Sequence, residues 1–129
     1  MTGAYPLIAI SIGAMLGALA RYGLSVTMNA LVPNIPMGTL ACNLIAAYIA
    51  GFAIAFFGTT AGLSVAWRLF LITGLAGGFS TFSTFSAELL TLIRDGRLGW
   101  SVGMLALHVG GSLVMTALGM ATLSLTRHT

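Results

Sequence analysis

A repeat of phenylalanine, serine and threonine runs through the third apolar stretch of the chain. It begins at Phe79 and reads Phe-Ser-Thr-Phe-Ser-Thr-Phe-Ser. Residues three apart are neighbours on a helix, so Phe82 and Phe85 form one stripe and the hydroxyl side chains form two others. The edge of a phenyl ring carries partial positive charge. Such a surface could guide a small anion, because ring edges and hydroxyls can replace part of its water.

Two glycines, Gly77 and Gly78, precede this repeat. Each weakens a helix by about 1 kcal/mol relative to alanine, and serine or threonine can compete with the helix by bonding to nearby backbone. We therefore predict a broken helix. Non-helical backbone at membrane depth is tolerated only beside protein or a watery cavity, so the break predicts a binding or permeation site. The alternative is ordinary aromatic core packing, with the hydroxyls bonded to their own helix.

Composition places the whole chain in a membrane. Of its 129 residues, 58% are hydrophobic and 5% are charged. A hydrocarbon core of about 30 Å needs about 20 helical residues to cross it. Four stretches meet this requirement, namely 5–28, 37–57, 67–92 and 100–125. The sequence therefore predicts an all-α membrane protein, a single four-helix transmembrane domain over residues 1–129.

The arginines give no clear orientation to these four helices. Arg68 and Arg127 lie toward one side of the membrane, Arg94 and Arg97 lie toward the other, and Arg21 lies within the first helix. A count of two against two gives the positive-inside rule no preference. The chain could therefore insert both ways and enclose a pathway as an antiparallel homodimer. The alternative is that the weak bias is an accident of few charges.

Other polar residues in the apolar stretches have two interpretations each. The amide of Asn43 is a neutral donor for an anion, or it bonds to a neighbouring helix. Arg21 concentrates anions in a vestibule, or it reaches for the membrane interface. Glu88 pairs with an arginine or lines a pore mouth. His108 and Ser112 share a face of the fourth helix, but a catalytic triad there would lack a mid-span acid, so we do not predict an enzyme.

The net charge and the cysteine content argue against a nucleic-acid partner and against an internal disulfide. The net charge of +3 comes from five arginines and two acids, without a basic run, so nucleic acid is not an expected partner. Cys42 is the only cysteine in the chain, which rules out an internal disulfide.

Three ordered motifs closely resemble the Fluc family of small bacterial fluoride channels, and the resemblance runs over nearly all four helices. The motifs are Gly17-Ala18-x-x-Arg21-Tyr22, Gly38-Thr39-Leu40-x-x-Asn43 and residues 77–86. The resemblance implies an antiparallel, dual-topology homodimer in the bacterial inner membrane. It also implies two fluoride pores, passive export that lowers intracellular fluoride, and a structural Na⁺ at the dimer centre.

The same resemblance implies a role for particular residues. The backbone carbonyls of Gly77 and Ser80 would hold the Na⁺. Residues of the ion pathway would be Phe82 and Phe85 lining the pores, Asn43 capping the path, Thr39, Ser83, Thr84 and Ser112 continuing a polar track, and Arg21 in the vestibule.

This chain departs from the family pattern at several positions. Ala46 and Ala47 follow the asparagine where Gly-Ser is frequent. Ser80 and His108 stand where threonine and tyrosine are expected. Coordination by a backbone carbonyl does not depend on the Ser80 side chain, whereas His108 leaves one position of the polar track without an assigned role.

Two other functions remain as alternatives to a fluoride-selective channel. A small proton-coupled multidrug exporter shares four helices and dual topology, but it needs a carboxylate inside the membrane. The acids of this chain, Glu88 and Asp95, are expected at or beyond the end of the third helix. A structural subunit of a larger membrane complex would give no flux when purified alone.

Overall fold

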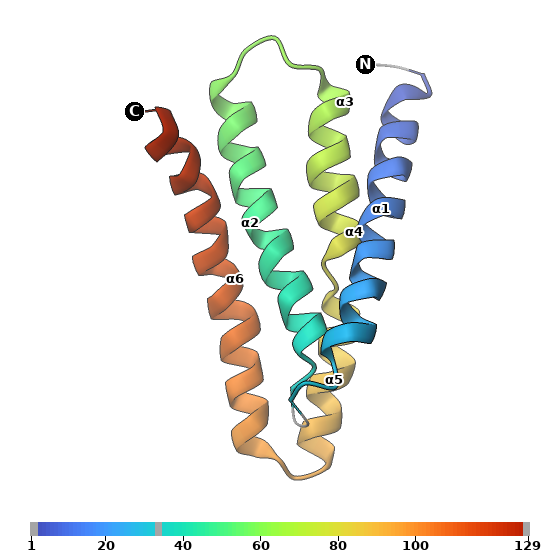
Figure 1. Ribbon diagram of the computed structural model, residues 1–129, viewed down its shortest axis with the longest axis vertical. Helices are drawn as coiled ribbons and strands as arrows, with labels where there is room; N and C mark the ends of the chain where they lie inside the picture. The colour runs from blue at the N-terminus through green and yellow to red at the C-terminus, as the bar shows by residue number, and fades with distance from the viewer. Residues whose placement is uncertain (1–2, 33–34, 128–129) are drawn as a thin grey trace.

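Helices account for nearly all of the computed structural model, which describes residues 3–32 and 35–127. Four helical spans in this described part of the chain are long and apolar enough to cross a membrane. They confirm the four predicted spans. Figure 1 shows them side by side, with the two ends of the chain at the same end of the bundle.

The first two spans are uninterrupted helices. α1 covers Tyr5–Met28 and has a proline in its first turn, where a missing N–H costs nothing. α2 covers Met37–Thr59 and follows Pro36, whose extended backbone (φ −68°, ψ 99°) separates the two helices. α2 ends two residues beyond the predicted end of this span at residue 57.

The third span is broken, as predicted, but the break lies beyond the two glycines. The span consists of α3 (Val65–Arg68), the wide π-helical turns of η1 (Leu69–Ala76), α4 (Gly77–Phe79) and α5 (Phe82–Arg94). Gly77 is helical (φ −63°, ψ −40°), whereas Ser80 (φ −82°, ψ 158°) and Thr81 (φ −151°, ψ 111°) are extended. The narrow connection above α5 in Figure 1 is this break.

The fourth span, α6, is one helix over Leu98–Arg127. A tight turn joins it to α5, and Gly96 adopts φ 76° there, a left-handed conformation that suits glycine. α6 packs mainly along α2, while α1 packs along η1 and α4. The described bundle is therefore two helix pairs, and α5 continues the third span under α2 and beside α6 (Figure 1).

Small residues allow the backbones of α1 and the third span to touch. A Cβ atom added at Gly78 would lie 2.7 Å from the carbonyl oxygen of Ala14. A Cβ added at Gly77 would meet nothing in the described chain closer than the Ile72 oxygen at 3.6 Å. Gly78 therefore serves close helix packing rather than breaking the helix.

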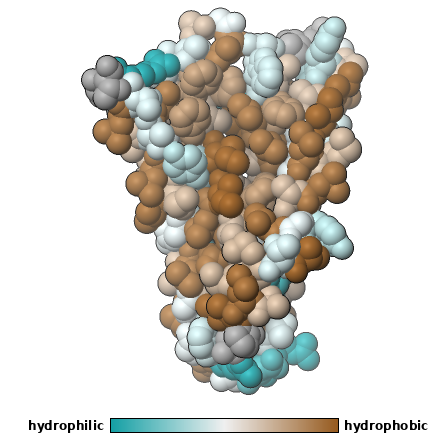
Figure 2. All heavy atoms as spheres, viewed as in Figure 1, coloured by the Kyte–Doolittle hydropathy of each residue, from teal (hydrophilic) through white to brown (hydrophobic). Residues whose placement is uncertain are grey.

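The outside of the bundle is apolar along most of its length. In Figure 2, hydrophobic side chains cover most of the visible face and hydrophilic ones gather mainly toward the two ends. Large apolar residues such as Leu19, Val102 and Leu113 are exposed. Lipid can cover such side chains, as expected for a membrane protein that crosses the bilayer several times.

The contact at Gly13 predicts a stability difference between two glycines of α1. A Cβ at Gly13 would lie 2.5 Å from the Phe70 oxygen, whereas one at Gly23 would meet no described atom within 4 Å. We expect Gly13→Ala to lower the free energy of unfolding by about 1 to 3 kcal/mol through overpacking. Gly23→Ala, the matched control, should leave it unchanged or raise it. Unfolding in detergent micelles measures both, and equal stabilities would contradict this packing.

Candidate functional site

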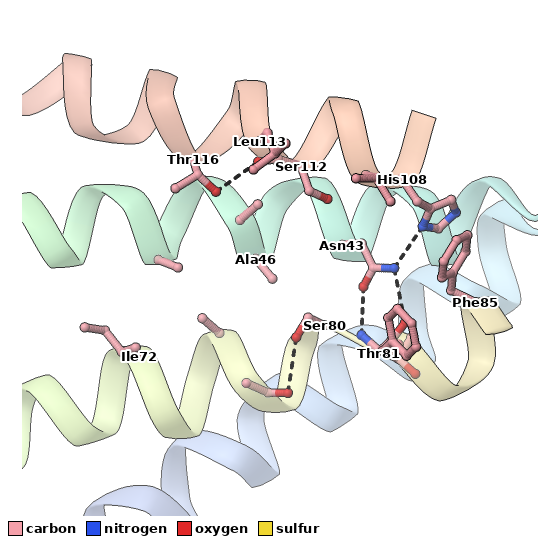
Figure 3. Close-up of a pocket in the computed structure, with 16 residues that line it drawn as sticks. Asn43, Ala46, Ile72, Ser80, Thr81, Phe85, His108, Ser112, Leu113 and Thr116 are labelled. Carbon is pink, nitrogen blue, oxygen red and sulfur yellow. Dashed lines mark hydrogen bonds between the residues drawn. The ribbon is translucent and has the colours of Figure 1, made fainter. Parts of the chain in front are cut away.

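An open cleft of about 520 Å³ runs between the third span and the pair formed by α2 and α6. Its walls are mostly apolar, with a few polar groups from all three spans. Figure 3 shows these groups converging near the break, where Asn43, Thr81 and His108 meet. Pockets that combine an apolar lining with a few convergent polar groups are the usual form of a small-ligand site.

The side chain of Asn43 bonds to both backbone groups of Thr81. The Thr81 N–H donates to Asn43 Oδ1 at 2.7 Å, and Asn43 Nδ2 donates to the Thr81 carbonyl at 3.2 Å. Thr81 is buried and non-helical, so these groups would otherwise be unsatisfied at a high cost in an apolar environment. Asn43 on α2 thus replaces the helical hydrogen bonds that the break removes.

A threonine hydroxyl caps the first turn of the helix that follows the break. The Thr84 N–H donates to Thr81 Oγ1 at 3.2 Å, which makes Thr81 the N-cap of α5. Threonine is among the preferred N-cap residues because its oxygen accepts an N–H that has no partner within the helix. The cap fixes the direction in which α5 begins, and with it the positions of Phe82 and Phe85.

These two replacement hydrogen bonds leave two backbone carbonyls without their usual helical donors. In an unbroken helix, the Thr81 N–H would bond to the Gly77 oxygen and the Thr84 N–H to the Ser80 oxygen. Both donors bond elsewhere here, to Asn43 and to Thr81 Oγ1. The Gly77 oxygen retains a contact of 3.4 Å from the Ser80 hydroxyl. Carbonyls of unwound helices are the groups that coordinate Na⁺ in membrane proteins, so Gly77 and Ser80 fit the chemistry of a sodium site.

Arg21 reaches the same break from α1. Its Nε donates to the Gly78 carbonyl at 3.2 Å, and the residue is partly buried. This contact satisfies a carbonyl near the end of α4. The side chain is therefore attached to the break instead of extending freely toward a membrane interface.

The two phenylalanines of the predicted stripe lie in different surroundings. Their ring centroids are 5.7 Å apart at an interplanar angle of 67°, an edge-to-face arrangement. Phe82 is 77% exposed, whereas Phe85 is 4% exposed and stacks on the His108 ring at 4.3 Å. Both line the cleft. The stripe therefore has one ring held within the bundle and one ring facing out of it.

Glu88 is inside the third span and not at its end. It lies within α5, and its Oε2 accepts a hydrogen bond of 3.0 Å from the hydroxyl of Thr39. Thr39 is almost fully buried. The expectation that Glu88 lies at or beyond the helix end is therefore wrong, because α5 continues to Arg94. Its partner is a hydroxyl on α2 rather than an arginine.

The structure brings some of the predicted site residues together and separates others. The cleft is lined by Gly77, Ser80, Phe82, Phe85, Asn43 and Ser112. Arg21, Thr39 and Thr84 contact the break or Glu88 from outside the lining, and Ser83 is exposed on α5. The roles of all these residues stay predictions.

Two residues at the centre of the arrangement are absent from the predicted site. Thr81 was detectable in principle, since a threonine before a run of helix formers is a start signal for a helix. His108 Nδ1 lies 3.0 Å from Asn43 Nδ2, an inter-helix contact between α2 and α6 that no local pattern reveals. Both residues line the cleft.

Comparison with known proteins identifies relatives over almost the full length of the chain. Residues 8–120 match the family described as CrcB-like protein, Camphor Resistance (CrcB). A protein named fluoride-specific ion channel FluC from Xanthomonas oryzae pv. oryzae (strain MAFF 311018) is 65% identical over 127 residues, covering 98% of this chain and 94% of that protein. The protein of the same name from Pseudomonas putida (strain W619) is 59% identical over 116 residues, 90% of this chain and 91% of that protein. Another from Nitrosomonas europaea (strain ATCC 19718 / CIP 103999 / KCTC 2705 / NBRC 14298) is 51% identical over 119 residues, 92% and 94% of the two chains.

The double hydrogen bond of Asn43 predicts a large effect of its removal. Asn43→Ala leaves two buried backbone groups of Thr81 without this partner, and each such group costs about 1 to 3 kcal/mol. Ser80→Ala is the matched control at the break, because it removes only the 3.4 Å contact with Gly77. We expect the unfolding free energy in micelles to fall for Asn43→Ala alone, with faster hydrogen exchange at the Thr81 amide. Unchanged exchange at Thr81 would contradict the contact.

Proposed function

The chain belongs to the CrcB family, and from this premise we propose that it is a fluoride-specific ion channel. It would let F⁻ pass downhill out of the cell and so lower the intracellular concentration of fluoride. The inner membrane of a bacterium is the compartment in which this activity would relieve fluoride stress. No catalytic step is part of this proposal.

The observation that carries the proposal is the set of neutral donors and ring edges around the break. Fluoride is small and strongly hydrated, so a path for it must replace water without holding the ion too tightly. The hydroxyl of Ser112 and the edges of Phe82 and Phe85 offer partial positive charge without a full charge. The NH₂ group of Asn43 lies within hydrogen-bond distance of the Thr81 carbonyl and of His108 Nδ1, so Asn43 shapes this part of the path through the break. Arg21 adds a positive charge nearby, where it raises the local concentration of anions.

We propose further that two copies of this four-helix domain form an antiparallel homodimer with two pores. The cleft is open in one chain, and the ring of Phe82 is largely uncovered. A second copy would enclose both. Arg127 donates to Thr59 and Thr60 at one end of the bundle, beside the loop that leads to Arg68. Arg94 and Arg97 flank the turn between α5 and α6, so each end carries two and neither orientation is favoured.

A structural Na⁺ at the centre of this dimer is the third part of the proposal. The carbonyls of Gly77 and Ser80 would hold it, because both lack their usual helical donor and both residues line the cleft. The ion would supply a positive charge that holds together the broken helices of the two copies. Backbone coordination explains why serine can stand at position 80 in place of threonine.

A proton-coupled multidrug exporter is the rival function, and the position of Glu88 gives it one supporting observation. A partly buried carboxylate within a span is the group that such an exporter exchanges between proton and drug cation. The two functions differ in the ion that moves. A purified channel passes fluoride down its gradient in the absence of any proton gradient, whereas an exporter passes organic cations against a proton flux.

Fluoride efflux from liposomes that contain the purified chain tests the function and the role of the rings. Phe82→Ile and Phe85→Ile keep apolar bulk but lose the positive edge, and loss of an interaction of about 1.5 kcal/mol would slow efflux about tenfold. Phe79→Leu is the control, because Phe79 packs in the buried cluster with Cys42 and Ala46. Parental efflux in correctly assembled Phe82→Ile and Phe85→Ile proteins would reduce the stripe to core packing.

Labelling from the two sides of the membrane tests the antiparallel dimer. Gly58→Cys and Gly96→Cys place thiols at opposite ends of the bundle, each in a Cys42→Ala background. Because the terminal arginines are balanced, we expect an impermeant thiol reagent to label each site from both sides. Labelling of each site from one side only would exclude dual topology. Two lysines added to the C-terminal tail should then favour one orientation and depress efflux.

A further inference from the structure

We propose that a groove between α1 and α3 binds an anionic phospholipid, with one acyl chain in the groove and the phosphate group at Arg68. The groove has a volume of about 250 Å³ and lies where the third span begins, beside α1 (Figure 1). Its lining comes from α1 and from the first turns of the third span, and consists of Ala9, Ile12, Ser64, Ala66, Trp67 and Phe70.

This groove is separate from the large cleft at the break. No residue lines both of them. The cleft is the surface that a second copy would enclose in the proposed dimer, so the groove remains available to another occupant. The lipid site therefore goes beyond the proposed channel function and does not depend on it.

The walls of the groove suit a hydrocarbon chain. On the third span, the rings of Trp67 and Phe70 meet edge to face, with centroids 5.9 Å apart and planes inclined by 86°. On α1, Ala9 and Ile12 are three residues apart and lie on one face of the helix. The small side chains of Ala9 and Ala66 leave room between the two walls. An acyl chain is the flexible apolar occupant that a bilayer offers to such a space.

The groove lies at the end of a span, where lipid headgroups are close. Ser64 is the N-cap of α3, and Trp67 lies in the first turn of the span Val65–Arg94. Trp67 is 58% exposed, and its indole N–H has no hydrogen-bond partner among the described residues. Tryptophan at this depth keeps its ring among acyl chains and directs its N–H to the polar groups of the lipid.

Arg68 supplies the positive charge, and the chain offers it no carboxylate at this end. The only two acidic residues of the sequence are Glu88 and Asp95. They lie within α5 and at its C-cap, toward the other end of the third span. Arg68 is exposed and makes no hydrogen bond or ion pair with any residue that the structure describes. Guanidinium groups bind phosphate through paired N–H donors, so a lipid phosphate can supply the missing counter-ion.

Helix geometry directs this charge to the headgroup end of the groove. Arg68 is four residues after Ser64 and therefore lies on the same face, one turn further into the span. Long side chains on a helix point back toward its N-terminus, so the guanidinium extends toward the start of the span. Its apolar stem then lies along the bilayer and its charge reaches the interface. An anionic headgroup is favoured over a zwitterionic one, because it has no ammonium group that offsets the phosphate.

Quenching of Trp67 fluorescence by brominated lipids tests the proposal with the full chain. Trp100→Phe leaves Trp67 as the only tryptophan. Vesicles of phosphatidylcholine receive a rising fraction of phosphatidylglycerol or of phosphatidylcholine with brominated acyl chains. Both leaflets have the same composition, so the orientation of the chain does not affect the result. We expect half-maximal quenching at an about fivefold lower fraction of the anionic lipid, as for one arginine near the headgroups.

Two arginines at the same end of the bundle separate a bound lipid from general attraction to a positive surface. Arg68→Gln should bring the two brominated lipids to equal quenching. Arg127→Gln is the matched control, because it removes the same charge from a side chain that is bonded to the end of α2. It should keep the preference. Ala9→Leu fills the groove without a change of charge, and should reduce the preference because the acyl chain loses its space.

Several outcomes would overturn the lipid site. One is equal quenching by both lipids before Arg68 is changed, and another is a preference that survives Arg68→Gln or is lost equally in Arg127→Gln. An unchanged preference in Ala9→Leu would remove the groove from the site. Absence of quenching by either lipid would show that protein, such as a second copy, covers the groove. Far-UV circular dichroism in the same vesicles checks that each variant is folded, and no step requires fluoride flux.

Discussion

The need to satisfy backbone polar groups inside an apolar environment is the constraint on which the rest of the structure depends. Two extended residues interrupt the third span, and lipid offers no hydrogen bonds to compensate. Asn43 meets this need at Thr81 by bonding to both of its backbone groups. The polar centre of the bundle is therefore a consequence of the break. The same bonds set the orientation of the Asn43 amide, and together with the Thr81 cap they leave the Gly77 and Ser80 carbonyls without their usual helical donors.

Hydropathy alone predicted the spans because it requires no knowledge of which helices touch. The four stretches of the sequence correspond closely to the four helical spans. The position of the break was harder to predict. Two glycines appeared to mark it, yet Gly78 is helical and supports close contact with Ala14, while the break follows at Ser80 and Thr81. Its place is determined by Asn43, which is 38 residues away in the chain and on another helix.

The candidate site was predictable where helical periodicity governs it and not where inter-helix contacts do. A spacing of three residues places Phe82 and Phe85 together, and their rings do contact. The same spacing does not predict burial. The two rings differ in burial because α6 supplies a stacking partner to Phe85 alone. The contact of His108 Nδ1 with Asn43 joins α6 to α2, and no local pattern reveals it. Glu88 lies within α5, and its contact with Thr39 on α2 is between helices, which no local pattern predicts.

Fluoride specificity is the property that the proposed pathway must provide, because a hydroxyl and ring edges line the cleft while the charge of Arg21 lies outside that lining. The most direct measurement is the reversal potential of current through the purified chain in a planar bilayer, with fluoride on one side and an equal concentration of chloride on the other. We expect a reversal potential far from zero, of the sign that indicates a membrane permeable to fluoride and closed to chloride. A reversal potential near zero, with both anions carrying current, would contradict this specificity.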